Sequence, residues 1–238
     1  MNRVRWLNAE WPIPIRLLTK KIQGMSFAEG SYDGFVLDKA RDDYFEARYI
    51  ERVDLKEVVV DPFGNEHSFE RLEFRQIAFR ASMFFPGVEL VDSHRNISKM
   101  LNRLSEAADF GVAITPISVS ALAWAENLQE ELSADSIIDS MQIGSIKIET
   151  GILVKAIISG DRDVRSAGEY ISQGRGFTLE KLRVRLRAPF DGTIVLSNRG
   201  AATVVTESGA EELIAILRSS LAKAVSKPDG QVVPFSGN

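Results

Sequence analysis

The segment LEKLRVRLRAPF, residues 179–190, constrains the fold more than any other stretch of the chain. Apolar residues and cations alternate in it with a period of two. The apolar members are Leu182, Val184 and Leu186, and the cations are Lys181, Arg183, Arg185 and Arg187. Because a β-strand turns successive side chains to opposite faces, the pattern predicts a strand with cations about 6–7 Å apart on one face. Such a strand belongs in a sheet that packs one face on a core and leaves the other in solvent.

Both strand-like and helix-like periods recur along the chain. Alternation over 35–82, interrupted by the turn sequence DPFGNE, predicts long antiparallel strands. The segment IPIRLLTKKI (13–22) reads as a strand whose start is kept at a sheet edge by Pro12 and Pro14. Helical spacing predicts helices near 97–108, 120–132 and 210–225. The expected fold class is therefore α+β, with largely antiparallel sheets and helices packed on one face. The order of elements from about 145 to 225 suits a ferredoxin-like outline in the C-terminal half.

The length of 238 residues is large for one domain and small for two. Apolar residues make up 45% and charged residues 26%, as in ordinary globular proteins, so the chain can bury a proper core. A change of pattern near Ala134 predicts an α+β sub-domain over 1–134 and a second over 135–226, which carries the basic strand. The polar stretch 227–238 is expected to be a flexible tail.

The sequence also limits the compartment and the cofactors. It contains no cysteine, which excludes a disulfide scaffold and thiolate zinc sites and fits a cytoplasmic protein. Residues 1–16 lack the apolar core of a signal peptide, and the most apolar stretch, 110–125, is too short and too interrupted for a bilayer span. No dinucleotide fingerprint or phosphate loop is complete. We therefore expect a soluble protein without a cofactor or a membrane partner.

Catalytic signals are sparse. The chain has two histidines, His67 and His94, and no G-x-S-x-G elbow. The sequence DSH at 92–94 is compatible with a metal site formed by Asp92 and His94, but a helix cap at Asp92 or Ser93 is the simpler interpretation. These observations favour a protein that is not an enzyme.

A divalent-metal nuclease is the enzymatic alternative. Such sites often combine an early acid with an acid-x-Lys pair, in which acids hold the metal and the lysine orients or activates water. Asp54 and Lys56 fit the pair, and Asp38, Asp42 or Asp43 is available as the early acid. About one or two acid-x-Lys triplets are expected by chance in a chain of this composition, so the motif stands at background frequency.

The charge distribution singles out the basic strand. The chain carries a formal net charge of −4, yet residues 162–199 contain eight cations and four acids, or +4, which leaves −8 elsewhere. Acids on neighbouring strands, an acidic protein partner or phosphates can each balance such a face, and arginine forks suit phosphates geometrically. Since aromatic residues are lacking on it, nucleic acid is expected to make backbone contacts rather than base contacts. The predicted binding residues are Arg175, Lys181, Arg183, Arg185 and Arg187.

The leading hypothesis is a non-enzymatic cytosolic protein that acts in a complex. Its basic face would bind DNA or RNA backbone, or an acidic protein partner. The alternatives are the nuclease that uses Asp54 and Lys56, and a purely structural subunit of an oligomer. In the last case VVPF (232–235) and the N-terminal edge strand would pair with another chain.

Overall fold

The structure, a computed structural model, describes residues 1–92, 96–132, 134–173 and 175–226. These residues form 11 strands and five helices, which confirms the α+β class. They divide into two compact units, an N-terminal unit of residues 9–114 and a C-terminal unit that joins residues 1–8 to the chain from 115 onward. Position 134, where the sequence predicts a domain boundary, lies inside the C-terminal unit. His94 and the tail 227–238 lie outside the described residues.

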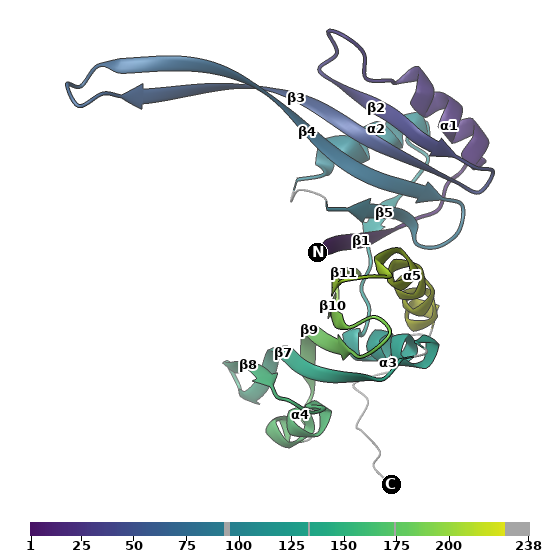
Figure 1. The fold of residues 1–238 in the computed structure, drawn as a ribbon, viewed down its shortest axis with the longest axis vertical. Helices are drawn as coiled ribbons and strands as arrows, with labels where there is room; N and C mark the ends of the chain where they lie inside the picture. The colour runs from purple at the N-terminus through teal and green to yellow at the C-terminus, as the bar shows by residue number, and fades with distance from the viewer. Residues whose placement is uncertain (93–95, 133, 174, 227–238) are drawn as a thin grey trace. The chain divides into compact units, whose positions relative to one another are not determined.

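The N-terminal unit is a four-stranded antiparallel sheet with helices on one face (Figure 1). The strand order is β2-β3-β4-β5. Its elements are α1 (Ile15–Gly24), β2 (Asp33–Ala40), β3 (Tyr44–Val60), β4 (Glu66–Ser82), β5 (Gly87–Val91) and α2 (Ser98–Ala107). The two long strands pair without a register shift from Tyr44↔Ser82 to Val60↔Glu66.

Aromatic rings form the core of this unit. Phe35 lies 5.4 Å from Tyr49 and 5.8 Å from Phe79, centroid to centroid, and Phe45 lies 5.9 Å from Phe79. The two pairs that include Phe79 are edge-to-face, a geometry that adds to the stabilisation from burial alone. The side chains come from β2, β3 and β4 at alternating positions, as the strand prediction for 35–82 requires.

Residues 15–24 form α1, so the edge strand predicted over 13–22 is wrong. Ile15, Leu18 and Ile22 are buried at helical spacing on α1. Pro14 stands at the N-cap and its carbonyl accepts the first helical hydrogen bond, from the Leu18 amide at 3.1 Å. Proline is tolerated at a helix start, because the first amides have no helical acceptor.

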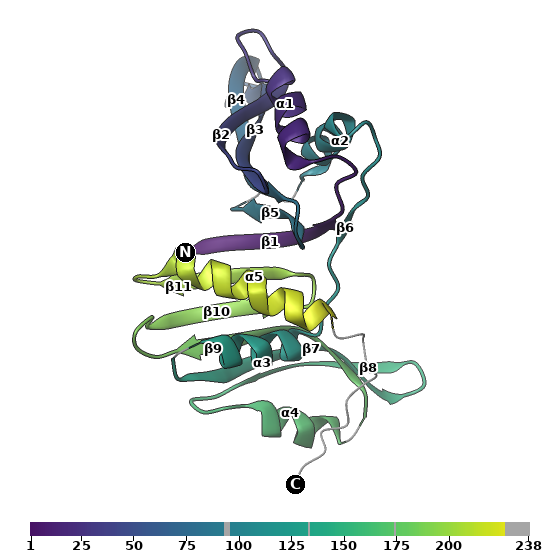
Figure 2. The same cartoon turned by 90° about the vertical axis from the view of Figure 1, so that its right-hand side faces the viewer.

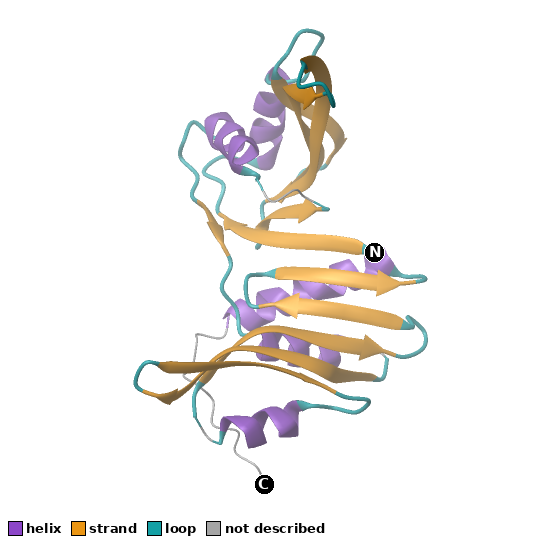
Figure 3. Cartoon of the chain, turned by 90° about the vertical axis from the view of Figure 1, so that its left-hand side faces the viewer, coloured by secondary structure: helices purple, strands orange, loops and turns teal. Residues whose placement is uncertain are grey.

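The C-terminal unit has a sheet in the order β1-β11-β10-β9-β7-β8, and short β6 also pairs with β1. Helices α3, α4 and α5 lie on one side of it (Figure 2), and the strands alone face the viewer from the other side (Figure 3). Its elements are β1 (Asn2–Ala9), β6 (Ile114–Pro116), α3 (Ala121–Glu131), β7 (Ser136–Glu149), β8 (Ile152–Ser159), α4 (Arg165–Ser172), β9 (Phe177–Leu186), β10 (Gly192–Ser197), β11 (Ala201–Thr206) and α5 (Ala210–Ser226).

One part of this sheet contains a single split βαβ unit, which is one element of the ferredoxin-like outline. Strands β8 and β9 both pair antiparallel with β7, which lies between them, and α4 connects them, so the three form a split βαβ unit. Strands β9, β10 and β11 then follow as consecutive antiparallel neighbours.

Two tryptophans centre the core of the C-terminal unit. Trp6 of β1 and Trp124 of α3 are fully buried, with ring centroids 5.7 Å apart in an edge-on arrangement. The Trp124 Nε1–H donates to the Leu217 carbonyl at 3.2 Å and to Ser220 Oγ at 3.1 Å, both on α5. One ring therefore fixes α3 against both the sheet and α5, and its polar atom is satisfied.

None of the helices among the described residues is both long enough and apolar enough to cross a bilayer.

The tryptophan pair predicts a large effect of one substitution. Trp124→Ala should lower the free energy of unfolding of the C-terminal unit by about 3–5 kcal/mol, because it empties a core site and leaves α5 without its anchor. Urea denaturation followed by circular dichroism measures the loss. Val205→Ala, at a half-exposed position of β11, is the control and should change it by less than about 0.5 kcal/mol. Equal effects of the two changes would contradict this account of the core.

Candidate functional site

Strand β9 carries its cations on the face of the C-terminal sheet that no described helix covers (Figure 3). Leu182, Val184 and Leu186 are buried on the helix side. The cations of the opposite face are Lys181, Arg183 and Arg185. The other two predicted binding residues lie outside the strand: Arg175 precedes β9, and Arg187 follows it in the connection to β10, where its amide donates to the Asp135 carbonyl. The strand therefore presents three cations in line.

Two further cations join this face from β1. The register places Arg3 beside Thr203, Thr203 beside Val195, and Val195 beside Arg183, in one row across four strands.

A second row runs from Arg5 through Ala201 and Ser197 to Lys181. Each row begins and ends with a cation and has short or β-branched side chains between. The two ends are about 14 Å apart, from three strand spacings. We call the surface formed by Arg3, Arg5, Lys181, Arg183 and Arg185 the basic face.

A buried carboxylate lies beneath the basic face. Asp139 of β7 has 0% exposure and accepts hydrogen bonds from Nε of Arg183 at 2.6 Å and Nε of Arg185 at 2.7 Å. The β7–β9 register shifts between Ile138 and Ser140, so Asp139 is the extra residue of a β-bulge. The bulge turns its carboxylate to the cationic side and places it between the two guanidinium groups.

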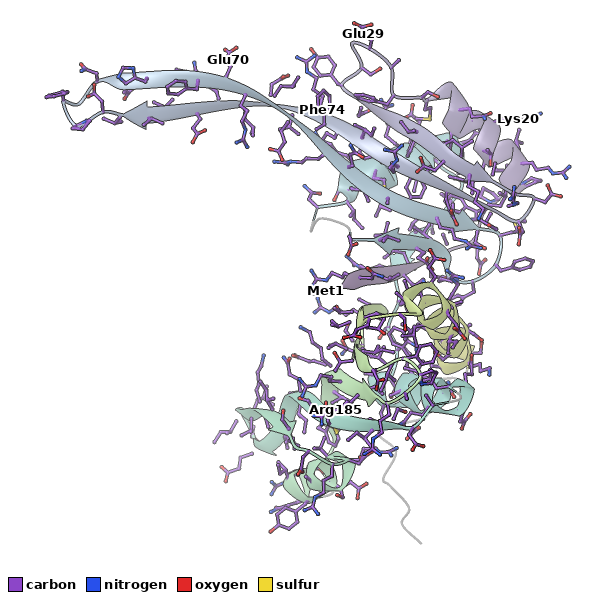
Figure 4. The ribbon with its side chains drawn as sticks, viewed as in Figure 1. Met1, Lys20, Glu29, Glu70, Phe74 and Arg185 are labelled. Carbon is purple, nitrogen blue, oxygen red and sulfur yellow. The ribbon has the colours of Figure 1, made fainter. Side chains whose placement is uncertain are left out.

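This arrangement explains how the strand tolerates clustered cations. One negative charge between Arg183 and Arg185 offsets their mutual repulsion, and the two hydrogen bonds fix both side chains. The arginines remain 41% and 44% exposed, so their outer N–H groups face solvent. Figure 4 labels Arg185 on this unit. In contrast to Arg183 and Arg185, neither Arg5 nor Lys181 forms an ion pair with another residue that the structure describes.

The sequence contained a sign of the β1 cations that the prediction did not use. Arg3, Val4 and Arg5 repeat the R-V-R of residues 183–185, with the same alternation. No comparable sequence pattern points to Asp139, because a single acid within SIIDSMQI does not indicate that a β-bulge forms there.

The basic face has no aromatic side chain among its register partners. Phe190 is buried, and Phe177 pairs in register with buried Ile146. Apolar side chains occur instead: Val205 is 46% exposed beside Thr193, and Ile157 of β8 is 74% exposed. The surface therefore combines fixed cations with aliphatic contact area.

The nuclease residues lie elsewhere, on β3 of the N-terminal unit. Asp54 forms an ion pair with Arg52 at 3.1 Å, on the same strand as Lys56. Asp38 and Asp42 each form an ion pair with an arginine instead. Among the described residues, no three acids or histidines gather closely enough to hold a metal ion. Asp54 is thus not part of such a group among the residues that the structure describes.

The outer halves of β3 and β4 form a projecting hairpin (Figure 1). Strand β2 pairs with β3 only as far as Glu51, and β5 pairs with β4 only from Ala78, so the residues beyond have no third strand. We call residues 53–73 the arm. Figure 4 labels Glu70 on the arm and Phe74 near its base.

The arm exposes apolar side chains to an unusual degree. Phe63 at the turn is 90% exposed. The other exposed large apolar residues of the arm are Val58, Val59, Val60, Phe69 and Leu72. An isolated two-stranded hairpin is only marginally stable in water, and its free edges invite pairing with another chain.

The arm is also acidic. Six carboxylates and two cations give it a net charge of −4. The carboxylates are Asp54, Glu57, Asp61, Glu66, Glu70 and Glu73, and the cations are Lys56 and Arg71.

The turn of the arm is tightly hydrogen-bonded. Asp61 accepts from the Asn65 side chain at 3.0 Å, from the amides of Asn65 and Phe63, and lies 3.3 Å from the His67 ring. These bonds, the Asn65 side chain first, lower the pKa of Asp61 to about 2. Gly64, with φ of +86°, supplies the left-handed position that the turn requires.

No family model matches the chain, and no curated protein sequence matches it.

Asp139 predicts a specific loss of stability. Asp139→Asn should lower the free energy of unfolding by about 2 kcal/mol, because two charge-assisted hydrogen bonds are lost. The exposed halves of the arginines can still be hydrated, so the loss should stay below that of a fully buried ion pair. Glu207→Gln, an exposed acid-to-amide change on the same unit, is the control, and urea denaturation measures both. A loss as small as that of Glu207→Gln would refute the role given to Asp139.

Asp61 predicts a pH dependence of the arm. The depressed pKa stabilises the turn above the ordinary aspartate pKa, and the stabilisation disappears as the pH falls through about 2. NMR titration of the Asp61 side-chain carbon should give a midpoint near 2. Asn65→Ala should raise this midpoint towards the ordinary value, since it removes the largest cause. A midpoint that does not differ between wild type and Asn65→Ala would contradict the turn geometry.

Proposed function

We propose that this chain is a binding protein that works in a complex, and that its basic face contacts an acidic surface of another protein molecule. The observation that supports this most is the arrangement of cations at the ends of two parallel rows. Arg3 and Arg183 end one row, and Arg5 and Lys181 end the other. A sheet surface with cations about 14 Å apart and short side chains between them suits an elongated acidic partner.

The composition of the face favours a protein over nucleic acid. Sheet surfaces that bind single strands usually stack bases on aromatic rings, and the register partners here include none. Half-exposed Val205 adds aliphatic contact area, which suits a protein surface.

A direct test compares two labelled probes. One is a synthetic peptide of alternating glutamate and valine, and the other is a mixed-sequence oligonucleotide, offered single- and double-stranded. The peptide should bind the wild-type chain, and its affinity should fall as salt rises, because exposed charges are screened. Arg5→Glu with Lys181→Glu should weaken peptide binding by about tenfold or more, since attraction becomes repulsion. Substituting Arg183 or Arg185 by glutamate is unsuitable, because the new carboxylate would lie beside Asp139.

The control variant carries the same change of charge away from the face. Lys20→Glu with Arg41→Glu alters two exposed cations of the N-terminal unit and should leave peptide binding unchanged. Oligonucleotide binding that is tighter than peptide binding and is lost with Arg5→Glu plus Lys181→Glu would replace the proposal by nucleic-acid binding. Absence of binding to both probes would reject a role of the face in binding.

A further inference from the structure

The arm and the basic face are complementary in charge and in size. One face of the arm carries the even-numbered residues, as the register Val60↔Glu66, Val58↔Ser68 and Lys56↔Glu70 shows. This face contains three carboxylates and one cation. The acids are Asp54, Glu66 and Glu70, the cation is Lys56, and the apolar members are Val58, Val60 and Leu72.

The spacing of the acids matches the spacing of the cations. Glu66 and Glu70 lie four residues apart on β4, which is about 13 Å along a strand. The cations at the two ends of each row of the basic face are about 14 Å apart. An arm that crosses the strands of the face would therefore bring Glu66 and Glu70 near opposite ends of the rows.

The side chains between the charges are also compatible. Val58 and Ser68 lie between the two glutamates on the arm, and Val195 and Thr203 lie between the cations of one row. Lys56, which lies beside Glu70, weakens the attraction of this face of the arm to cations. The three carboxylates still outnumber the one lysine, so this face has a net negative charge. The net charge of the whole arm, −4, is opposite in sign to that of the basic face.

From these observations we propose that the arm of one molecule lies across the basic face of a second copy of the same chain. This inference rests on the proposed function and names its partner. The contact would cover exposed apolar side chains of the arm, which an isolated hairpin leaves in water. Because the arm and the face are different surfaces, the contact is heterologous. Mutual exchange of arms closes a dimer, and one-way exchange continues into a ring or a filament.

The test measures the molar mass of the full chain by sedimentation and light scattering. Wild type should associate as protein concentration rises and dissociate as salt rises. The arm variant Glu66→Lys plus Glu70→Lys, and the face variant Arg5→Glu plus Lys181→Glu, should each weaken self-association by about tenfold or more. The control Glu29→Lys plus Glu130→Lys alters two exposed acids outside the arm and should behave as wild type.

Mixing the two variants gives the sharper result. The face variant retains an acidic arm, and the arm variant retains a basic face, so an equimolar mixture should associate although neither variant does so alone. This recovery also shows that both variants are folded. A wild-type chain that stays monomeric at every concentration, or an arm variant that associates as wild type does, overturns the inference.

The result separates the inference from the proposed function. If the acidic peptide binds the basic face while the wild-type chain remains monomeric, the face binds acidic protein surfaces but the partner is not a second copy. If neither the peptide binds nor the chain associates, both proposals fail.

Discussion

Each sheet of this chain buries one face beneath helices, and the pattern of side chains along its strands follows from that constraint. In the N-terminal unit the covered face holds Phe35, Phe45 and Phe79, and in the C-terminal unit it holds Trp6 and Leu182. A strand places every second residue on the opposite face, where charged side chains can be hydrated. The uncovered face of the C-terminal sheet therefore accommodates cations that a doubly covered sheet would exclude, because burying unpaired charge is costly.

The cations of the uncovered face are not only hydrated, since Asp139 accepts hydrogen bonds from two of them. A β-bulge places this buried carboxylate between Arg183 and Arg185, which holds both guanidinium groups in one orientation. Arginines fixed in this way lose little conformational entropy when a partner binds.

The arm differs from the rest of its unit, because its strands extend past their neighbours and bury no core. Its acidic and apolar residues are available for contact, so the chain displays two surfaces of opposite charge.

Local patterns were sufficient to predict much of the fold. The alternation over 35–82 and 181–187 predicted strands, and helical spacing predicted the helix near 120–132. Ser120 caps this helix, α3, by accepting from the Ala123 amide at 3.3 Å. The segment 13–22 was mistaken for a strand because Pro12 and Pro14 suggested an edge, whereas Pro14 starts α1. Of the predicted binding residues, Lys181, Arg183 and Arg185 share one strand face, and Arg175 and Arg187 lie beyond its ends. Alternation alone does not show where a strand stops.

The sequence by itself determined that residues 181–186 form a strand with one cationic side, because side-chain direction in a strand depends only on position. It also determined that the chain is α+β, since two periods recur in it. Only the tertiary structure decided that Arg3 and Arg5 lie in rows with Arg183 and Lys181, and that Asp139 pairs with two of these arginines. Pairing between residues more than a hundred positions apart depends on strand order and register, which are set by packing of the whole sheet. For the same reason, the projection of the arm was decided by where β2 and β5 end.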